Sequence, residues 1–272
     1  EVFGQRMLGQ FIGVGVDVDE AGRHDLPAGV DDSRGRGIAE RADRLVEVRR
    51  EIHAYPEVAW TEHRTSELVY SELTAAGLAP RRIGATGIVC DLPGGSGAAT
   101  HRRIALRADL DALPIAEETG LTFASTRPGI SHACGHDVHT AAVLGAGLAL
   151  ADLSARGELP VGVRLVFQPA EEVQPGGAEA FLSGGVLEGV EQIYALHCDP
   201  KTEVGTIGSR IGSITSASDP ITVTLRSHGG HTSRPHMTGD VVYALGQVIA
   251  QASGVLGRRM DPRAGVNLTW GA

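Results

Sequence analysis

Apolar and polar positions along residues 38–206 follow two periods, one typical of helices and one typical of strands. Apolar residues recur at helical spacing from Ile38 to Ile52, with Glu and Arg on the other face, and Pro56 ends the pattern. Further helices are expected at residues 61–76, 136–155 and around 180–182, and strands at residues 88–92, 103–109, 161–168 and 192–196. Strands that alternate with helices predict an α/β fold with a mainly parallel sheet flanked by helices.

The two ends of the chain follow other patterns. Residues 1–37 are rich in Gly and Asp and predict a poorly structured leader, with a loop at residues 31–37. From residue 205 the pattern becomes a connector, a half-exposed strand, a helix and a second strand, at residues 205–210, 219–225, 240–256 and 265–270. We therefore expect a leader (1–37), a main domain (38–206) and part of a second, α+β domain (207–272), which we expect the chain to leave incomplete.

Composition limits the classes of function. Hydrophobic content of 42% and charged content of 21% are typical of a soluble globular protein. A net charge of −9 makes nucleic acid and anionic membranes poor partners. No stretch approaches the ~18 apolar residues of a membrane span, and the first residues lack a secretory pattern. Three cysteines (Cys90, Cys134 and Cys198) argue against a disulfide framework. We therefore expect a cytoplasmic protein without nucleic-acid or membrane partners.

Residues 132–139 hold the densest group of reactive side chains in the chain. Five residues able to bind a metal or move a proton lie within eight positions: His132, Cys134, His136, Asp137 and His139. An apolar helix follows at once, and polar groups at the mouth of a buried helix are costly to desolvate unless they are paired. The alternative is a capped helix with solvated histidines. The combination of Cys-x-His with Asp and a further His favours a metal site.

Other candidates come directly after predicted strands. In open α/β sheets, ligands bind at the carboxyl ends of the strands. Four segments are expected to converge at that edge: Asp109, the Glu171–Glu172 pair, His197, and the turn that contains Cys134 and His136. Their shared position in the topology predicts a single pocket.

The donor types indicate the chemistry of that pocket. Thiolate, imidazole and carboxylate together suit Zn²⁺ or another borderline divalent ion. The candidates Cys134, His136, Glu172 and His197, with Asp109 or Asp137 nearby, exceed one tetrahedral shell, which predicts two ions ~3.5–4 Å apart. One glutamate of the Glu171–Glu172 pair can bind metal while the other takes a proton from water. The alternative for this pair is a solvated helix start, and its position after an apolar strand and Pro169 argues against that.

Six segments resemble the M20 metallopeptidase and amidohydrolase superfamily, in particular the group with N-acyl-amino-acid amidohydrolases, hippurate hydrolases and auxin-conjugate hydrolases. In order along the chain they are residues 49–57, 106–114, 132–139, 167–172, 195–197 and 230–236. The resemblance implies that Glu171 is the general base and that the metal ligands are Cys134, His136, Glu172 and His197.

The resemblance also assigns supporting roles. Asp109 stands where the family often carries an acidic residue that orients a metal-site histidine, and Arg107 stands where peptidase relatives have that histidine. His231 matches a residue that the family projects from the smaller domain, often of the partner subunit, to stabilise the oxyanion. The second domain would therefore be a partial ferredoxin-like dimerisation domain, and the protein a homodimer.

The resemblance implies an activity and two alternatives. The implied activity is hydrolysis of N-acyl-amino acids with two divalent ions, Zn²⁺, Mn²⁺ or similar, and the Cys134 motif favours it. A dipeptidase or carboxypeptidase on the same scaffold is one alternative. The other is a catalytically incomplete homologue, because the family continues beyond this point and supplies a late histidine ligand that this sequence does not contain.

Overall fold

The computed structural model describes residues 10–15, 32–95, 102–212, 214–215 and 218–271. The chain divides into two units, Glu1–Ala217 and Ser218–Ala272, and each is described by itself. The short strand β7, Thr206–Gly208, lies where the sequence predicted the domain boundary, and it belongs to the sheet of the first unit.

The first unit is built on a seven-stranded sheet in the order β2-β3-β5-β4-β6-β1-β7. The strands other than β7 are β1 (Gln10–Gly15), β2 (Arg81–Ile83), β3 (Gly87–Leu92), β4 (Arg103–Asp109), β5 (Gly162–Gln168) and β6 (Val190–Cys198). The pairs β4–β5, β4–β6 and β1–β6 are parallel. The pairs β2–β3, β3–β5 and β1–β7 are antiparallel. The α/β class is confirmed, but the sheet is mixed, partly because the short β2–β3 connection permits only antiparallel pairing.

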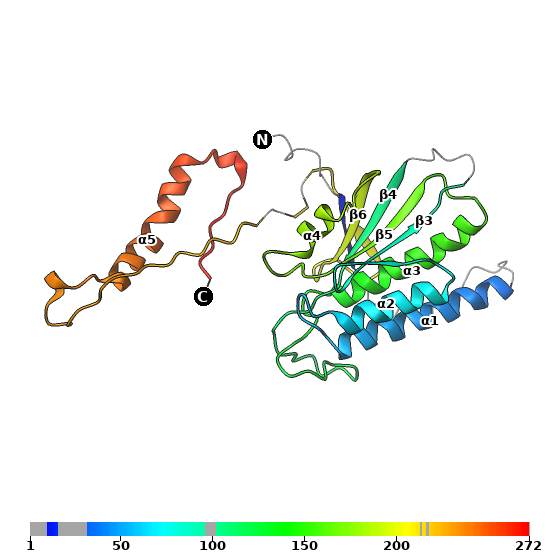
Figure 1. Ribbon diagram of the computed structural model, residues 1–272, viewed down its shortest axis with the longest axis horizontal. Coiled ribbons are helices and arrows are strands. Elements are labelled where there is room, and N and C mark those ends of the chain that lie inside the picture. Colours follow the sequence, from blue (N-terminus) through cyan, green and yellow to red (C-terminus); the bar gives the residue numbers. More distant parts are fainter. Residues whose placement is uncertain (1–9, 16–31, 96–101, 213, 216–217, 272) are drawn as a thin grey trace. The chain divides into compact units, whose positions relative to one another are not determined.

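Helices cover both faces of this sheet (Figure 1). One face carries α1 (Asp32–Ala54), α2 (His63–Ala75) and α3 (His136–Ala155), and the other carries α4 (Gly177–Ser183). Successive side chains of β3 point to opposite faces of the sheet, as in any strand, and so pack against different helices. Ile88 packs in the core with Leu144 of α3, whereas Val89 packs with Phe181 of α4.

Helix α3 is apolar over most of its length, and its first half lies in the core, where residues 136–141, Val143, Leu144 and Gly147 are buried. Among the described residues, α3 is the one helix that is long and apolar enough, by length and composition, to cross a membrane. The helix is not an unbroken apolar stretch, because its first turn carries His136, Asp137 and His139 and its last turns carry Asp152 and Ser154. Leu144 and Val143 are buried in the main core cluster, and the helix contacts both α1 and β4. Burial of the first half of α3 in the core accounts for the apolar character of that half.

The N-terminal region differs from the predicted leader. Residues 10–15 form β1, which pairs with β6 and β7. The expected loop at 31–37 is wrong over residues 32–37, because α1 already begins at Asp32. Gly35 and Gly37 each disfavour a helix by about 1 kcal/mol relative to Ala, which explains the expectation of a loop. The rest of the predicted leader, residues 1–9 and 16–31, lies outside the described residues.

The second unit contains α5 (Val241–Arg259) and two 3₁₀ turns, η2 (Pro235–Met237) and η3 (Pro262–Ala264). The predicted helix is present, and the Asp240 carboxylate caps it by accepting from the Tyr243 N–H at 2.8 Å. The predicted strands at 219–225 and 265–270 are wrong, since the described residues there form no strand. A strand requires a paired backbone, and neither segment pairs with another in this unit.

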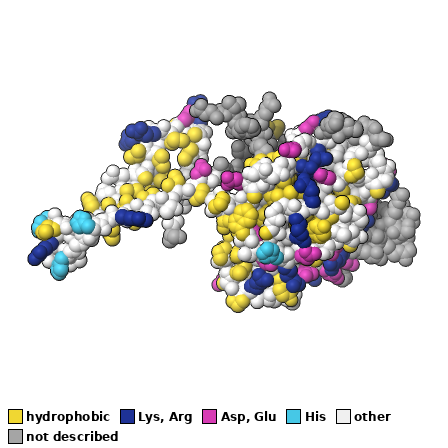
Figure 2. Space-filling model, in the orientation of Figure 1, with side chains coloured by type: hydrophobic (Ala, Val, Ile, Leu, Met, Phe, Trp, Pro, Cys, Tyr) yellow, Lys and Arg dark blue, Asp and Glu magenta, His cyan; other side chains and the backbone are white. Residues whose placement is uncertain are grey.

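Hydrophobic side chains lie exposed on this unit (Figure 2). Those on α5 include Val242, Tyr243, Leu245, Ile249, Val255 and Leu256. A complete second domain is therefore not confirmed, and the dimerisation role stays a prediction.

Candidate metal centre

The register of the parallel strands brings the predicted site residues to one edge of the sheet. Asp109, the last residue of β4, pairs with Gln168, the last residue of β5. Arg107 pairs with Ala195 of β6, so Asp109 is level with His197. The loop with Glu171 and Glu172 follows β5 directly. The four segments expected to converge therefore meet at the carboxyl ends of these strands.

Metal donors meet within this edge. Ligand atoms of Cys134, His136 and Glu172 all lie within 4.8 Å of one another. His136 Nε2 is 3.6 Å from Glu172 Oε1, and His197 Nε2 is 3.4 Å from Cys134 Sγ. The structure thus brings all four predicted ligands together, with His197 joined to the cluster through Cys134.

A glycine makes this arrangement possible at the start of α3. Gly135, between Cys134 and His136, has φ +88°, a left-handed conformation that glycine adopts without strain. A Cβ at this position would lie 3.0 Å from Cys198 Sγ. The turn therefore requires glycine both for its backbone conformation and for its close approach to β6.

Hydrogen bonds set the orientation of the two imidazoles. His136 Nδ1 lies 2.8 Å from the Asp111 carbonyl oxygen, and His197 Nδ1 lies 2.8 Å from the Cys198 carbonyl oxygen. A carbonyl only accepts, so each Nδ1 carries the proton. In the neutral rings Nε2 is then left with a lone pair, as in a metal-binding histidine held by a backbone carbonyl.

Two buried atoms of the cluster have no hydrogen-bond partner: His136 Nε2 and Glu172 Oε1. An unpaired buried polar atom costs about 1–3 kcal/mol. These two face each other beside a thiol, and a divalent cation would satisfy both. Cysteine, histidine and carboxylate are the ligands that zinc takes in proteins. The residues present therefore fit a metal ion.

The electrostatics of the pocket also favour a cation. Burial opposes charge on His136, but Asp111 and Cys134 raise its pKa to about 11. Contact with Cys134 raises the pKa of His197 to about 9. The two imidazoles in turn lower the pKa of the Cys134 thiol. Anionic groups thus dominate the pocket, and metal binding there would displace protons.

The two adjacent glutamates differ in depth. Their backbone N–H groups donate to the Asp111 carboxylate, at 2.9 Å for Glu171 and 3.0 Å for Glu172. The Glu172 side chain is 23% exposed, whereas that of Glu171 is 40% exposed, with Oε2 3.9 Å from His136 Nε2. Burial and the nearby Asp109 raise the pKa of Glu171. Glu171 is thus the more exposed of the two glutamates and has a raised affinity for a proton.

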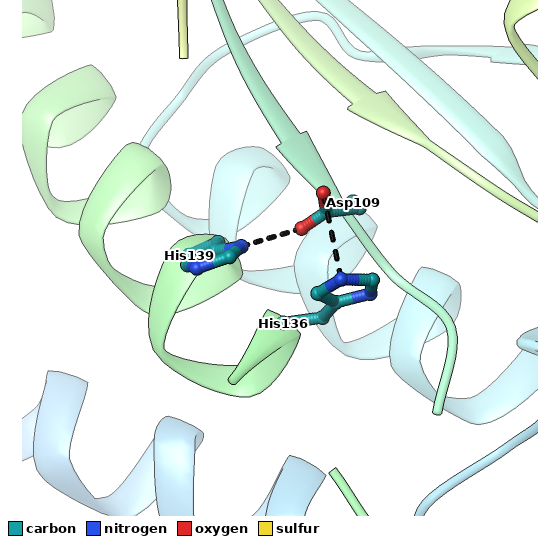
Figure 3. Close-up of side chains that lie close together, drawn as sticks. All are labelled: Asp109, His136 and His139. Carbon is teal, nitrogen blue, oxygen red and sulfur yellow. Dashed lines mark hydrogen bonds and ion pairs between the residues drawn. The ribbon is translucent and has the colours of Figure 1, made fainter. Parts of the chain in front are cut away.

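Asp109 is held by neighbours on both sides. Its Oδ1 accepts from His139 Nδ1 and its Oδ2 accepts from Arg107 Nη1, both at 2.7 Å. Although burial opposes the charged form, Arg107 and His139 keep the pKa of Asp109 well below its usual range. Figure 3 shows Asp109 at the end of β4, facing His136 and His139 on the first turn of α3. Its Oδ2 is 3.7 Å from His136 Nε2.

His139 has a role that the sequence did not predict. It lies close enough to Asp109 and His136 for a second metal group. Its Nδ1 donates to Asp109, however, and its Nε2 accepts from the Cys198 N–H at 2.9 Å. Neither nitrogen has a free lone pair, so His139 links α3 to β6. Its spacing of three from His136 was the available signal, since both then share one helix face.

Asp111 is the other residue that sequence reasoning missed. It binds the backbone of both glutamates, and its own carbonyl orients His136. Its position two residues after Asp109, directly beyond the end of β4, was the available signal.

His231 lies in the second unit. Its side chain is exposed, and its Nδ1 accepts from the Ser233 hydroxyl at 2.8 Å and lies 3.2 Å from the Ser233 amide. Its predicted contribution to the active site stays a prediction.

Thiol, imidazole and carboxylate donors thus meet at the carboxyl ends of the parallel strands of an α/β sheet, and this donor set suits a divalent metal ion. The chain belongs to peptidase family M20/M25/M40, whose family model matches residues 105–267. The family predicted from the sequence is thereby confirmed.

Relatives carry different names. A Rhodococcus jostii protein provisionally named glutamate–cysteine ligase 2-3 is 51% identical over 229 residues, which are 84% of this chain and 28% of that protein. N-acetyl-L-cysteine deacetylase of Bacillus subtilis is 38% identical, over 84% of this chain and 53% of the enzyme. The chain thus spans about half or less of the length of these relatives. The ligase name describes a protein of which this chain matches a small part.

A solved structure supports the same fold. The crystal structure of the Bacillus subtilis YXEP protein, described as a dinuclear metal-binding peptidase of the M20 family, matches with a TM-score of 0.59 and 40% identity. The match covers 64% of this chain and 48% of that protein. The α/β fold class is confirmed by this likeness.

Proposed function

We propose that this protein hydrolyses the amide bond of N-acyl-amino acids with the help of divalent metal ions. The products are a carboxylic acid and a free amino acid. Cys134, His136, Glu172 and His197 would hold the metal. The observation that carries the proposal is the pair of unpartnered buried atoms, His136 Nε2 and Glu172 Oε1, 3.6 Å apart beside Cys134.

When bound, a divalent ion supplies polarisation of the amide carbonyl and lowers the pKa of water to near neutrality. Glu171 then acts as the general base. It takes a proton from the water that attacks the acyl carbon and passes it to the departing amine nitrogen. Its raised pKa and its partly exposed position beside His136 suit both transfers. Asp109 supports the site through His139, which joins α3 to β6.

Two ions of the Zn²⁺ or Mn²⁺ type are proposed for each site. The dinuclear description of the YXEP protein supports this number. The name of the deacetylase relative supports an acyl-amino acid rather than a dipeptide as substrate. The proposed location is the cytoplasm, in keeping with the free thiols of Cys90, Cys134 and Cys198.

A panel of N-acyl-amino acids and dipeptides tests this function, with the complete gene product that contains this chain as the enzyme. Activity should appear on acyl-amino acids, disappear with a chelator and return with Zn²⁺ or Mn²⁺. Preference for dipeptides would favour the dipeptidase alternative. Metal binding without turnover of either class would favour a non-catalytic homologue.

His231 is proposed to donate a hydrogen bond to the developing oxyanion, from the second subunit of a homodimer. Such donors contribute about 2.7–4 kcal/mol to the transition state. Inactive His231→Ala and inactive Glu171→Gln protomers should therefore regain part of the activity when mixed, because a heterodimer contains one site with both residues intact. No recovery after demonstrated subunit exchange would contradict the role in trans.

A further inference from the structure

Two buried carboxyl groups hold the loop that carries Glu171 and Glu172. The N–H groups of three consecutive residues all donate to them. Those of Glu171 and Glu172 donate to Asp111, as described above. The N–H of Ala170 donates at 2.8 Å to Oε1 of Glu62, which lies 108 positions earlier in the sequence. Asp111 belongs to the metal centre itself, whereas Glu62 reaches the loop from the segment before α2.

Glu62 is fully buried, and its hydrogen bonds all come from neutral groups. Besides Ala170, the backbone N–H of Trp60 donates to Oε1 at 2.9 Å. The Thr86 hydroxyl donates to Oε2 at 2.8 Å. A carboxyl group buried without a cation among these partners is costly to desolvate. Filling space in the core would not require such a group, so its hydrogen-bonding capacity is the feature to explain.

The partners of Glu62 Oε1 have a property in common. Among the described residues, the two non-glycine residues with positive φ are Trp60 at 66° and Ala170 at 50°. Left-handed backbone costs roughly 1–2 kcal/mol for a residue with a side chain. A single oxygen atom accepts a hydrogen bond from each of these two strained residues. The Trp60 indole also donates to the Pro175 carbonyl at 3.2 Å, which joins the same two segments again.

We propose that Glu62 is a positioning residue for the metal centre. It holds Ala170 in the left-handed conformation, and this turn directs the next two side chains toward His136 and Cys134. Through this turn Glu62 would place Glu172 as a metal ligand and Glu171 as the general base; the second of these roles rests on the proposed function. Glu62 touches neither metal nor substrate and acts through the backbone of the loop.

Two substitutions of Glu62 separate hydrogen bonding from packing. In Glu62→Gln, the amide oxygen accepts from Trp60 and Ala170, and the amide N–H donates to the Thr86 hydroxyl, which can turn to accept. This variant should bind metal as the wild type does. In Glu62→Ala the two strained residues lose their shared acceptor. The affinity for Zn²⁺ should fall about 10–100-fold, the usual effect of losing a group that orients a ligand, and kcat should fall with it.

Glu57 provides a matched control. It lies in the same segment and is 5% exposed, but its Oε2 accepts from the Thr65 N–H at the start of α2. Glu57→Ala should lower the melting temperature without a comparable loss of Zn²⁺ affinity. Should Glu62→Ala not fold, Glu62→Asp keeps the carboxyl group but shortens its reach, and its Zn²⁺ affinity should also fall.

Competitive Zn²⁺ titration of all variants decides the proposal, with melting temperatures measured beside it. An equal loss of Zn²⁺ affinity in Glu62→Ala and Glu57→Ala would overturn the proposal. So would a Glu62→Gln variant that binds Zn²⁺ as weakly as Glu62→Ala does. Unchanged Zn²⁺ affinity in Glu62→Ala or Glu62→Asp would also overturn it. The titration does not depend on turnover. A wild type that cleaves no acyl-amino acid would therefore refute the proposed function while leaving this test intact.

Discussion

Two buried histidines on the same side of the sheet behave in opposite ways. His53 lies between two carboxylates, with Nδ1 2.7 Å from Asp137 Oδ2 and Nε2 3.0 Å from Glu117 Oε1. His136 also lies among carboxylates, but its Nε2 has no hydrogen-bond partner. Burial and nearby acids are common to both. A free ring nitrogen that faces other free donors is what distinguishes a candidate ligand from a structural histidine.

The two surroundings are separated by one step along α3. Asp137 follows His136 in sequence, yet its Oδ2 lies 2.8 Å from Arg49 Nε and contacts His53. From the sequence alone, either Asp109 or Asp137 was expected to lie near the metal. Asp137 is not part of the donor groups formed by the described residues, and it belongs to the cluster around His53.

The largest expected effect concerns turnover. Glu171→Gln removes the proposed base and should lower kcat by about 10²–10⁴-fold in the complete gene product, because the amide cannot accept the proton. Metal content, measured by elemental analysis, should stay unchanged. Glu172→Gln is the matched control, and it should lose metal. A loss of only a few-fold in Glu171→Gln would point to another base.

The next effect sharpens the contrast between the two histidines. Cys134→Ala and His136→Ala should each weaken Zn²⁺ binding strongly. The loss should exceed the factor of about 10–100 that is typical when a residue that only orients a metal ligand is removed. His53→Ala should retain Zn²⁺. Wild-type affinity should also weaken as pH falls, since binding requires a thiolate and neutral imidazoles. Normal metal content in Cys134→Ala, or loss of metal in His53→Ala, would break the comparison.

A smaller effect is expected on stability. His53→Ala removes one buried partner from Asp137, which keeps Arg49, and one from Glu117, which keeps the Ser125 N–H, and each lost partner costs about 1–3 kcal/mol. Urea unfolding should therefore show a decrease in the free energy of unfolding within this range or somewhat above it. An unchanged unfolding midpoint would mean that Arg49 alone satisfies Asp137.

The smallest effect is a dependence of that stability on pH. Burial by itself lowers the pKa of His53, but Asp137 and Glu117 outweigh burial and Arg49, and the pKa is raised. Burial lowers the pKa of the neighbouring His132 to about 4, so His132 stays neutral at higher pH. Because the pKa of His53 is higher in the folded state, protonated His53 stabilises the fold. This contribution is fully present below the unfolded-state pKa of about 6.5 and is lost as the pH rises through the folded-state pKa.

The difference in unfolding free energy between wild type and His53→Gln should therefore be largest near about pH 6 and shrink as the solution becomes alkaline. Denaturant titrations at a series of pH values measure it. A difference that is constant or grows with pH would contradict the assigned shift.

Local sequence determined several features of this protein. The bounds of α3 and β4 agree with those predicted. Both elements follow from patterns within a few neighbouring residues: a long apolar run after Gly135 for α3, and a short apolar segment before Leu110 for β4. The convergence of Asp109, the glutamate pair and His197 also followed from sequence, since the carboxyl ends of parallel strands share one edge.

Only the tertiary structure decided which atoms of these residues are free. The protonated nitrogen of His136 depends on a carbonyl 25 positions away, and the turn at Ala170 depends on Glu62. The strand β1 depends on β6, far along the chain. Hydrogen-bond partners of this kind arise from the approach of distant segments, so no local pattern of hydrophobic and polar residues encodes them.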